Sequence, residues 1–123
     1  MLEYGFVVSC RMAEPYYTTL QQLAKTNKTL KSRAANLFCK HFFSGAAAYI
    51  ENHIFLSISP VGVALKLSDK DCATLFELGG VPLRYFPKAP IKKGYVVIPK
   101  EIVEDDEELN GWIARSIAEI ETG

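Results

Sequence analysis

The stretch from residue 40 to residue 67 limits the possible folds of this chain most strongly. Its sequence, KHFFSGAAAYIENHIFLSISPVGVALKL, contains three runs of strand-forming residues joined by two very short connections. The runs are residues 42–50, 54–58 and 63–67. Asn52 tolerates the positive φ of a tight hairpin, and Pro60 followed by Gly62 is typical of a type I turn. Because side chains alternate between the faces of a strand, the stretch predicts a three-stranded antiparallel meander with one buried face.

The first of these runs has almost no side-chain bulk in its interior. Residues 45–48 are Gly-Ala-Ala-Ala, so a large element, most simply a helix, is expected to pack close to this backbone. We expect Trp112 and Ile113 to cover the small residues. The segment just before the run is ambiguous, because residues 34–38 could begin either a short second helix or the approach to the first strand.

Three segments have the sequence pattern of helices. Pro15 suits a first helical position, and apolar residues then recur near a period of 3.6 through residue 26. Ser68 and Asp71 form a capping box before a helix that Gly79 would end. Acids at residues 105–108 suit the start of a last helix, where the helix dipole favours negative charge. The apolar stripe of this last helix consists of Leu109, Trp112, Ile113, Ile117 and Ile120.

Two more strands are predicted between the second and last helices, at residues 83–86 and 94–98. The element order is then α-β-β-β-α-β-β-α, which predicts a single two-layer α+β domain with five strands over residues 15–123. Residues 1–14 are predicted to be an N-terminal extension. A short strand, a disordered tail and, with translation starting at Met12, an upstream segment are open alternatives for it. A lipoprotein signal is disfavoured because Glu3 stands where a positive charge is required.

The composition restricts the location and the partners of the protein. Fourteen basic and fourteen acidic residues give zero net charge, so no overall field attracts nucleic acid or an anionic membrane. No run of apolar residues is long enough to span a membrane. The cysteines, Cys10, Cys39 and Cys72, are odd in number and lack CxxC spacing, which indicates reduced thiols. We therefore expect a cytoplasmic protein that does not bind membranes.

The residues that could carry catalysis do not form a recognisable constellation. Cys39 and His41 lie two apart, which on a strand places them on one face, but no third group is identifiable that would orient the imidazole. Neither these residues nor Cys72 and His53 have the spacing of a metal site. The sequence also lacks a Walker A motif and a GxGxxG motif. We expect no enzymatic activity, no cofactor and no metal, and rank a thiol-based enzyme third among the possible functions.

Cations and aromatic residues alternate between the last two predicted strands, which makes this hairpin the predicted interaction surface. Its members are Arg84, Lys88, Lys92, Lys93 and Tyr95. Lysines along phosphates, with Tyr85 or Phe86 stacked on a base, would bind nucleic acid. Alternatively, the lysines and prolines protect a sheet edge from pairing while the aromatic residues belong to the core. Zero net charge and the acidic last helix favour the second interpretation.

Several segments together resemble the N-terminal domain of the TfoX family. They are residues 40–50, 54–55, 64–67, 82–85 and 95–99, followed by Trp112. The resemblance implies a two-layer α+β fold with a five-stranded antiparallel sheet, similar to secretion chaperones. Full-length TfoX/Sxy competence regulators also have a helical C-terminal domain and act with the cyclic AMP receptor protein at promoters. We expect this chain to lack the second domain, and it has Phe42-Phe43-Ser44-Gly45 where the family often has Met-Phe-Gly-Gly.

The resemblance supplies no catalytic residues to transfer, so the expected function is regulation. We expect a non-enzymatic cytoplasmic adaptor that acts by contact with a protein partner, in transcriptional or competence regulation. Nucleic-acid binding through residues 84–95 is the alternative. The identity of the partner is open, and a homodimer is compatible with the sequence.

Overall fold

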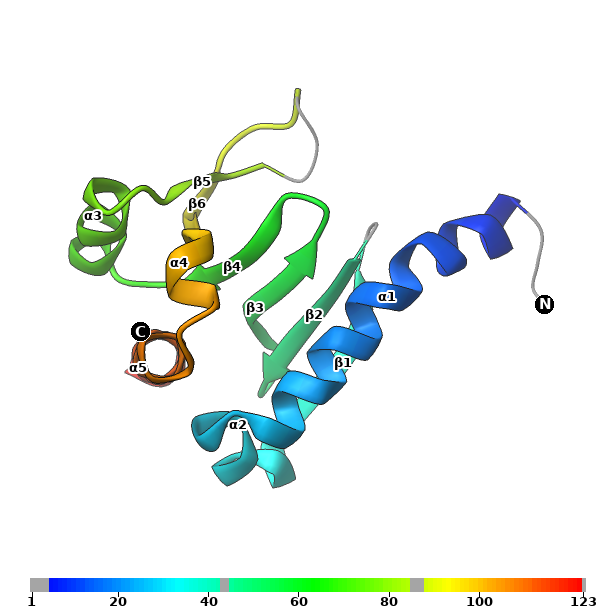
Figure 1. Cartoon of the computed structure of the whole chain (residues 1–123), viewed down its shortest axis with the longest axis horizontal. Helices are drawn as coiled ribbons and strands as arrows, with labels where there is room; N and C mark the ends of the chain where they lie inside the picture. The colour runs from blue at the N-terminus through cyan, green and yellow to red at the C-terminus, as the bar shows by residue number, and fades with distance from the viewer. Residues whose placement is uncertain (1–4, 43–44, 85–87, 123) are drawn as a thin grey trace.

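A computed structural model gives the backbone of residues 5–42, 45–84 and 88–122, and the side chains of these residues from Pro15 onward. Figure 1 shows the elements along the chain. The helices are α1 (Gly5–Thr26), α2 (Lys28–Ser32), α3 (Asp69–Glu77), α4 (Lys100–Val103) and α5 (Asp106–Thr122), with a 3₁₀ turn η1 (Ala34–Asn36). The strands are β1 (Leu37–Phe42), β2 (Gly45–Ile50), β3 (His53–Ser59), β4 (Gly62–Lys66), β5 (Val81–Leu83) and β6 (Lys92–Val97).

All six of these strands form one antiparallel sheet in the order β1-β2-β3-β4-β6-β5. The predicted α+β class with an antiparallel sheet is therefore confirmed, but the predicted number of five strands and the predicted element order are wrong. The additional strand is β1, which the sequence left open as a helix or an approach to the first strand. Phe42 pairs with Gly45, so what looked like one strand over residues 42–50 belongs to two.

The reason for Gly45 is also different from the one predicted. A Cβ atom at this position would lie 2.2 Å from the carbonyl oxygen of Ile58 in the neighbouring strand β3. The close neighbour that requires a glycine is thus a strand, whereas the alanines that follow it do contact a helix. The sequence pattern indicates that something approaches closely, but it does not distinguish a strand from a helix.

The predicted hairpin at residues 51–52 and the predicted two ends of α3 are confirmed. Glu51 and Asn52 have φ values of 50° and 69°, as a tight hairpin between β2 and β3 requires. The Ser68 hydroxyl accepts a hydrogen bond from the Asp71 amide at 3.2 Å and caps α3. After α3, Gly79 has φ +106°, the left-handed conformation expected at a helix end.

Other predicted boundaries differ from those of the structure. The helix predicted to begin at Pro15 is longer, because α1 begins at Gly5 and Pro15 lies inside it. The N-terminal half of α1 extends beyond the sheet (Figure 1). The predicted division of the chain at residue 14 stays a prediction, although the backbone of α1 runs through it. Strand β5 begins at Val81 rather than at residue 83, and residues 85–86 of the predicted strand lie outside the described residues.

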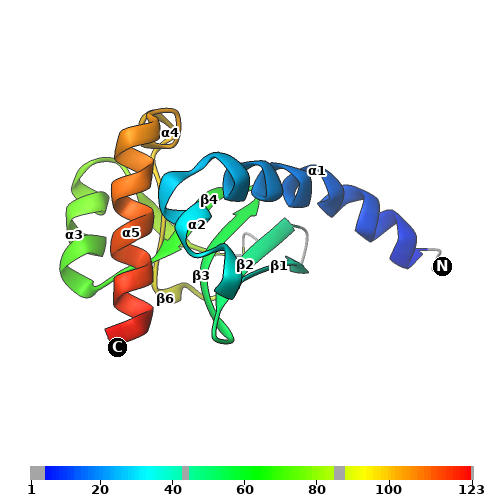
Figure 2. The same cartoon turned by 90° about the horizontal axis from the view of Figure 1, so that it is seen from below.

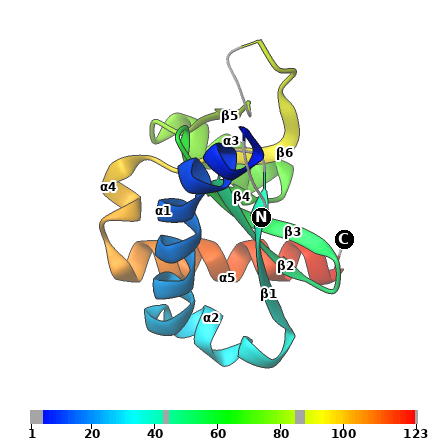
Figure 3. The ribbon, with the colours of Figure 1, turned by 90° about the vertical axis from the view of Figure 1, so that its right-hand side faces the viewer.

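The helices pack against one face of the sheet. Helix α1 lies over β1 and β2, α5 over β3 and β4, and α3 over β5 and β6. Figure 2 shows α5 between α3 and the α1–α2 pair, and in Figure 3 α1 runs vertically while α5 runs horizontally. Leu20, Leu75 and Ile113, one from each of these helices, are buried in the same apolar core. This arrangement places the core between the sheet and a single layer of helices.

The element that covers the small residues of β2 is α1, so the prediction that Trp112 and Ile113 cover them is wrong. Ile113 is fully buried and Trp112 packs at the margin of the core, but α5 lies further along the sheet. Ala46 and Ala48 belong to this core, whereas Ala47 points to the opposite face. The run of alanines therefore contributes to both faces of the sheet.

Candidate interaction surface

The face of the sheet turned away from the helices, which we call the open face, is defined by the strand register. One row of directly paired residues crosses the six strands. It consists of Lys40, Ala47, Ser57, Ala64, Val97 and Val81. The adjacent row, which contains Ala48, Leu56, Leu65 and Val96, faces the helices and is buried in the main core. Because directly paired residues share a face, the first row must point away from that core.

The open face has a centre of small residues and larger apolar residues around it. Ala47 and Ala64 are fully buried within their surroundings, and Ala64 forms a second small apolar cluster with Leu83 and Val97. At the two ends of the sheet, Phe38 is 62% exposed and Val81 is 52% exposed. A face that water alone covers usually carries polar side chains on most strands, so this apolar content is characteristic of a contact surface.

Lysine side chains lie over the tyrosines of this face. The Lys40 Nζ is 5.2 Å from the centre of the Tyr49 ring. The Nζ atoms of Lys66 and Lys92 are 5.9 Å and 5.6 Å from the centre of the Tyr95 ring. Such distances are in the range of cation–π contacts. The open face is therefore apolar with a positively charged margin.

One polar group on the open face is buried without a hydrogen bond. Ser57 is only 5% exposed, and its Oγ has no partner within the described part of the chain. Leaving a buried hydroxyl unpaired costs about 1–3 kcal/mol. Its neighbours in the row are Ala47 and Ala64, so an alanine at this position would fit the pattern of the strand pairs.

The predicted interaction residues at the β5–β6 end are only partly brought together. Lys92 lies beside Tyr95, as described, while Lys93 helps to line a groove between α3 and β6 with a volume of about 270 Å³. Arg84 is exposed, and its Nη1 donates to the carbonyl oxygen of Ala89 at 2.7 Å. Lys88 is exposed as well. These five positions thus occupy the margin of the open face and the groove instead of one continuous basic strip.

Tyr95 is held in place by contacts within the domain. Its hydroxyl donates to the carbonyl oxygen of Ile54 at 2.9 Å, so the side chain reaches from β6 to the start of β3. Its ring also has Lys66 and Lys92 nearby. Stacking of a nucleic-acid base on this ring would have to displace a lysine. The other aromatic residues considered for stacking lie outside the described residues; they are Tyr85 and Phe86.

The cysteine and histidine pair on β1 does not have the environment of an activated nucleophile. Cys39 and His41 lie on the same face of β1, as predicted, but the His41 ring stacks on Tyr17 of α1 with 4.5 Å between ring centres. Burial raises the pKa of the Cys39 thiol, whereas an activated thiol needs a lowered pKa. Within residues 5–42, 45–84 and 88–122, no three His, Cys, Asp or Glu side chains form a potential metal site.

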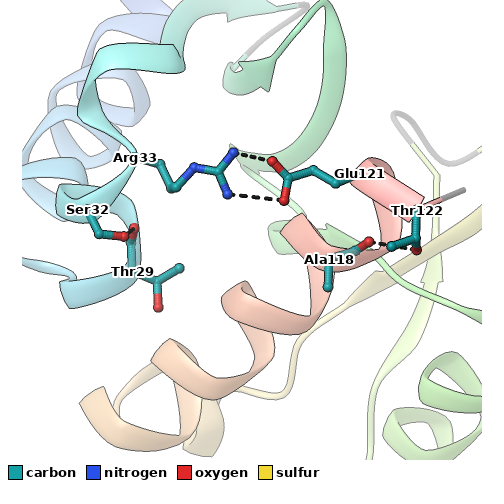
Figure 4. Close-up of polar contacts among 6 residues, drawn as sticks. All are labelled: Thr29, Ser32, Arg33, Ala118, Glu121 and Thr122. Carbon is teal, nitrogen blue, oxygen red and sulfur yellow. Dashed lines mark hydrogen bonds and ion pairs between the residues drawn. The ribbon is translucent and has the colours of Figure 1, made fainter.

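An ion pair holds the segment before β1 against the end of α5. The Arg33 Nη1 donates to Glu121 Oε1 at 3.1 Å, and Nη2 contacts the second carboxylate oxygen, as Figure 4 shows. The hydrogen bond from Arg33 lowers the pKa of Glu121, and the same bond raises the pKa of Arg33. Bidentate geometry of this kind fixes orientation as well as distance, so β1 begins at a defined position relative to α5.

Sequence reasoning did not identify the residues that form the open face. Phe38, Lys40 and Ser57 were not among the predicted interaction residues, although alternation within each strand places Phe38 and Lys40 together. The pairing between strands, which brings Ser57 and Val97 into the same row, was not available from any one segment. The predicted surface at residues 84–95 is therefore an edge of the surface that the structure contains.

These features define the class of the protein as a two-layer α+β domain with helices on one face of an antiparallel sheet and a second face that no described helix covers. The chain belongs to the TfoX N-terminal domain family, whose family model matches residues 28–120. Comparison with curated proteins and comparison with solved structures gave no match. In the part of the chain that the structure describes, no helix is both long and apolar enough to cross a membrane. The whole of α1 precedes the matched residues.

Proposed function

We propose that this domain is a non-enzymatic regulatory adaptor that binds a protein partner through the open face. Membership of the TfoX N-terminal domain family suggests a regulatory or competence-related role. The observation that carries the proposal is the open face itself, whose central row consists of small and apolar residues between Lys40 and Val81 although no described helix covers it. The apolar side chains at the two ends of this face, Phe38 and Val81, are exposed, and exposed apolar surface on a folded domain marks contact surfaces. We place this adaptor in the cytoplasm.

The chemistry of the face restricts the partner. Its centre consists of small and apolar residues, and Lys40, Lys66 and Lys92 stand at its margin. A complementary partner surface would present aliphatic or aromatic side chains with carboxylates around them. Nucleic acid would need cations in a line along the phosphates, whereas these lysines lie over tyrosines and are separated by apolar residues.

Site-specific photo-crosslinking tests this proposal. A photoreactive phenylalanine analogue is placed at Tyr49 or at Val81, two distant positions of the open face, and at the exposed Ala118 of α5 as the matched control. After irradiation in an extract of the source organism, we expect one protein adduct of the same mass from both open-face positions and none from Ala118. The Tyr49 position preserves the ring that the natural residue has, so this variant should fold.

The alternative outcomes are distinct. An adduct that forms equally from Ala118, or no adduct from either open-face position, would contradict the proposed contact surface. An adduct that nuclease treatment removes would support nucleic-acid binding instead. Crosslinking to a second copy of the chain is recognised by an adduct of twice the chain mass.

A further inference from the structure

The two edges of the sheet are very different. At one edge, β5 has three residues, one of which is Pro82 without a backbone N–H to donate. At the other edge, β1 has six residues, contains no proline and pairs with β2 without a register shift. Short edge strands and prolines prevent a sheet from pairing with another chain. The β5 edge has both protections and β1 has neither.

The outer edge of β1 is accessible. Among residues 5–42, 45–84 and 88–122, no strand pairs with β1 on the side away from β2. Figure 3 shows β1 at the near end of the sheet. Phe38, Lys40 and His41 are exposed, and Phe38 is the most exposed large apolar side chain in the described part of the chain. An edge strand with an exposed aromatic residue and no neighbouring strand among the described residues is a template for strand addition.

We propose that β1 pairs with β1 of a second copy of this chain, antiparallel about a two-fold axis at Cys39. The two six-stranded sheets then form one continuous sheet of twelve strands. A two-fold axis perpendicular to the sheet keeps both layers of helices on one side and both open faces on the other. Such an interface is isologous, the commonest kind in soluble homodimers.

Two criteria favour this register over the other symmetric registers of β1: the avoidance of like-charge pairs and the number of residues that pair. Directly opposite residues must share a face, so the axis passes through a residue of β1. An axis at Lys40 places the two lysines directly opposite each other, which is destabilising. An axis at Phe38 leaves only residues 37–39 of β1 paired. With the axis at Cys39, residues 37–41 all pair, and Phe38 lies opposite Lys40 of the second copy.

The pairs of this register are chemically compatible on both faces. On the open face, each Phe38 ring packs against the aliphatic stem of Lys40 in the other copy, with the ammonium group at the ring. On the covered face, Leu37 lies opposite His41 of the second copy, and the two Cys39 residues lie opposite each other. Lys40 lies opposite Phe38 and His41 opposite Leu37, so the register places no charge opposite a like charge.

A charge-swap series measured by sedimentation equilibrium tests both the dimer and its register. The wild-type chain is expected to have the dimer mass at micromolar concentration. Phe38→Lys places the introduced lysines opposite Lys40 of the other copy and should weaken self-association by roughly ten-fold or more, because two like-charge pairs replace two favourable ones. Adding Lys40→Glu to Phe38→Lys should restore the dimer. Val61→Lys, at an exposed apolar residue in the β3–β4 turn, is the matched control and should leave it unchanged.

A wild-type chain that stays monomeric to about 100 μM would overturn the proposal, since an interface of this kind should reach micromolar affinity. A Phe38→Lys dimer as tight as the wild type, or a double variant that stays monomeric, would overturn the register. Hydrogen exchange of the wild type gives a second test without any variant. Among residues 38–41, the backbone amides that point away from β2 should become more protected as concentration rises, and protection independent of concentration would count against pairing.

This inference does not depend on the proposed partner contact. Val81 lies at the opposite edge of the sheet from β1, so its crosslinks report on partner binding separately from the dimer. Loss of the dimer with retained Val81 crosslinks would refute only the strand pairing, and the reverse result would refute only the partner contact.

Discussion

Replacing two buried serines by alanine should change the free energy of unfolding in opposite directions. Ser116 of α5 is fully buried, and its hydroxyl donates to the carbonyl oxygen of Phe55 at 3.0 Å. Ser116→Ala loses this bond and leaves the carbonyl without that donor, which should cost about 1–2 kcal/mol. Ser57 is 5% exposed, and its hydroxyl has no partner among the residues that the structure describes. Ser57→Ala removes an unpaired group and should stabilise the domain by about 1 kcal/mol.

Urea unfolding followed by fluorescence of Trp112, the single tryptophan, measures both changes. With a slope of about 1–3 kcal/mol/M, the midpoints of the two variants should differ by about 1 M or more. The slopes should match that of the wild type, because neither change alters the surface exposed on unfolding. If both variants lose stability by the same amount, Ser57 has a partner in solution, and the argument that its hydroxyl is unpaired on the open face is refuted.

Three further predictions concern packing, pH and thiol reactivity. Gly111→Ala lies within α5, where nothing is near the added methyl group, and should stabilise the domain by about 0.5–1 kcal/mol. Gly45→Ala places its new Cβ 2.2 Å from a backbone oxygen and should destabilise the domain by about 3 kcal/mol. Thermal unfolding measures both changes. Because Arg33 lowers the pKa of Glu121, the ion pair stabilises the fold above the ordinary glutamate pKa of about 4.3, and this contribution is lost as the pH falls through the lower folded-state value. Glu121→Gln should therefore lower the urea midpoint at pH 7 but not at about pH 2, and an equal difference at both pH values would contradict this cause. Burial raises the pKa of the Cys72 thiol, so at pH 8 a maleimide should modify it roughly ten-fold more slowly than a free cysteine, and the rates should become equal in denaturing urea.

The features that could be predicted from the sequence are those determined within a few residues. The capping bond between Ser68 and Asp71 spans three positions, and the positive φ of Asn52 is a property of a two-residue hairpin. The start of α5 follows from its acidic first turn, because Asp105 accepts a hydrogen bond from the Glu108 amide at 3.1 Å. In each case, the residues that cause the structure are neighbours in the chain.

Strand β1 could not be predicted with confidence because its cause is not local. Its residues alternate only weakly, and the evidence for a strand lies in its pairing with β2 and in the packing of α1 over both. Gly45 shows the same limitation, since the atom that requires a glycine there belongs to Ile58. The contact that decides each of these features comes from another part of the chain.

The candidate site was partly predictable for the same reason. Lys92 and Tyr95 were expected on one surface because they are close in sequence, and they do lie together. The central row of the open face combines residues from all six strands, and a shift of one residue in any pairing would send that strand's side chains to the other face. Register is set by the whole sheet, so the composition of this face could be obtained only from the structure.

The two proposed surfaces are compatible because they overlap only at Phe38 and Lys40. Strand pairing at β1 uses backbone N–H and C=O groups at the edge, whereas partner binding uses side chains that project from the face between Tyr49 and Val81. Pairing about an axis perpendicular to the sheet extends the open face across both copies and does not cover it. A dimer would therefore present two equivalent partner sites on one side, and linking two sites in this way raises the apparent affinity for a partner that is itself dimeric.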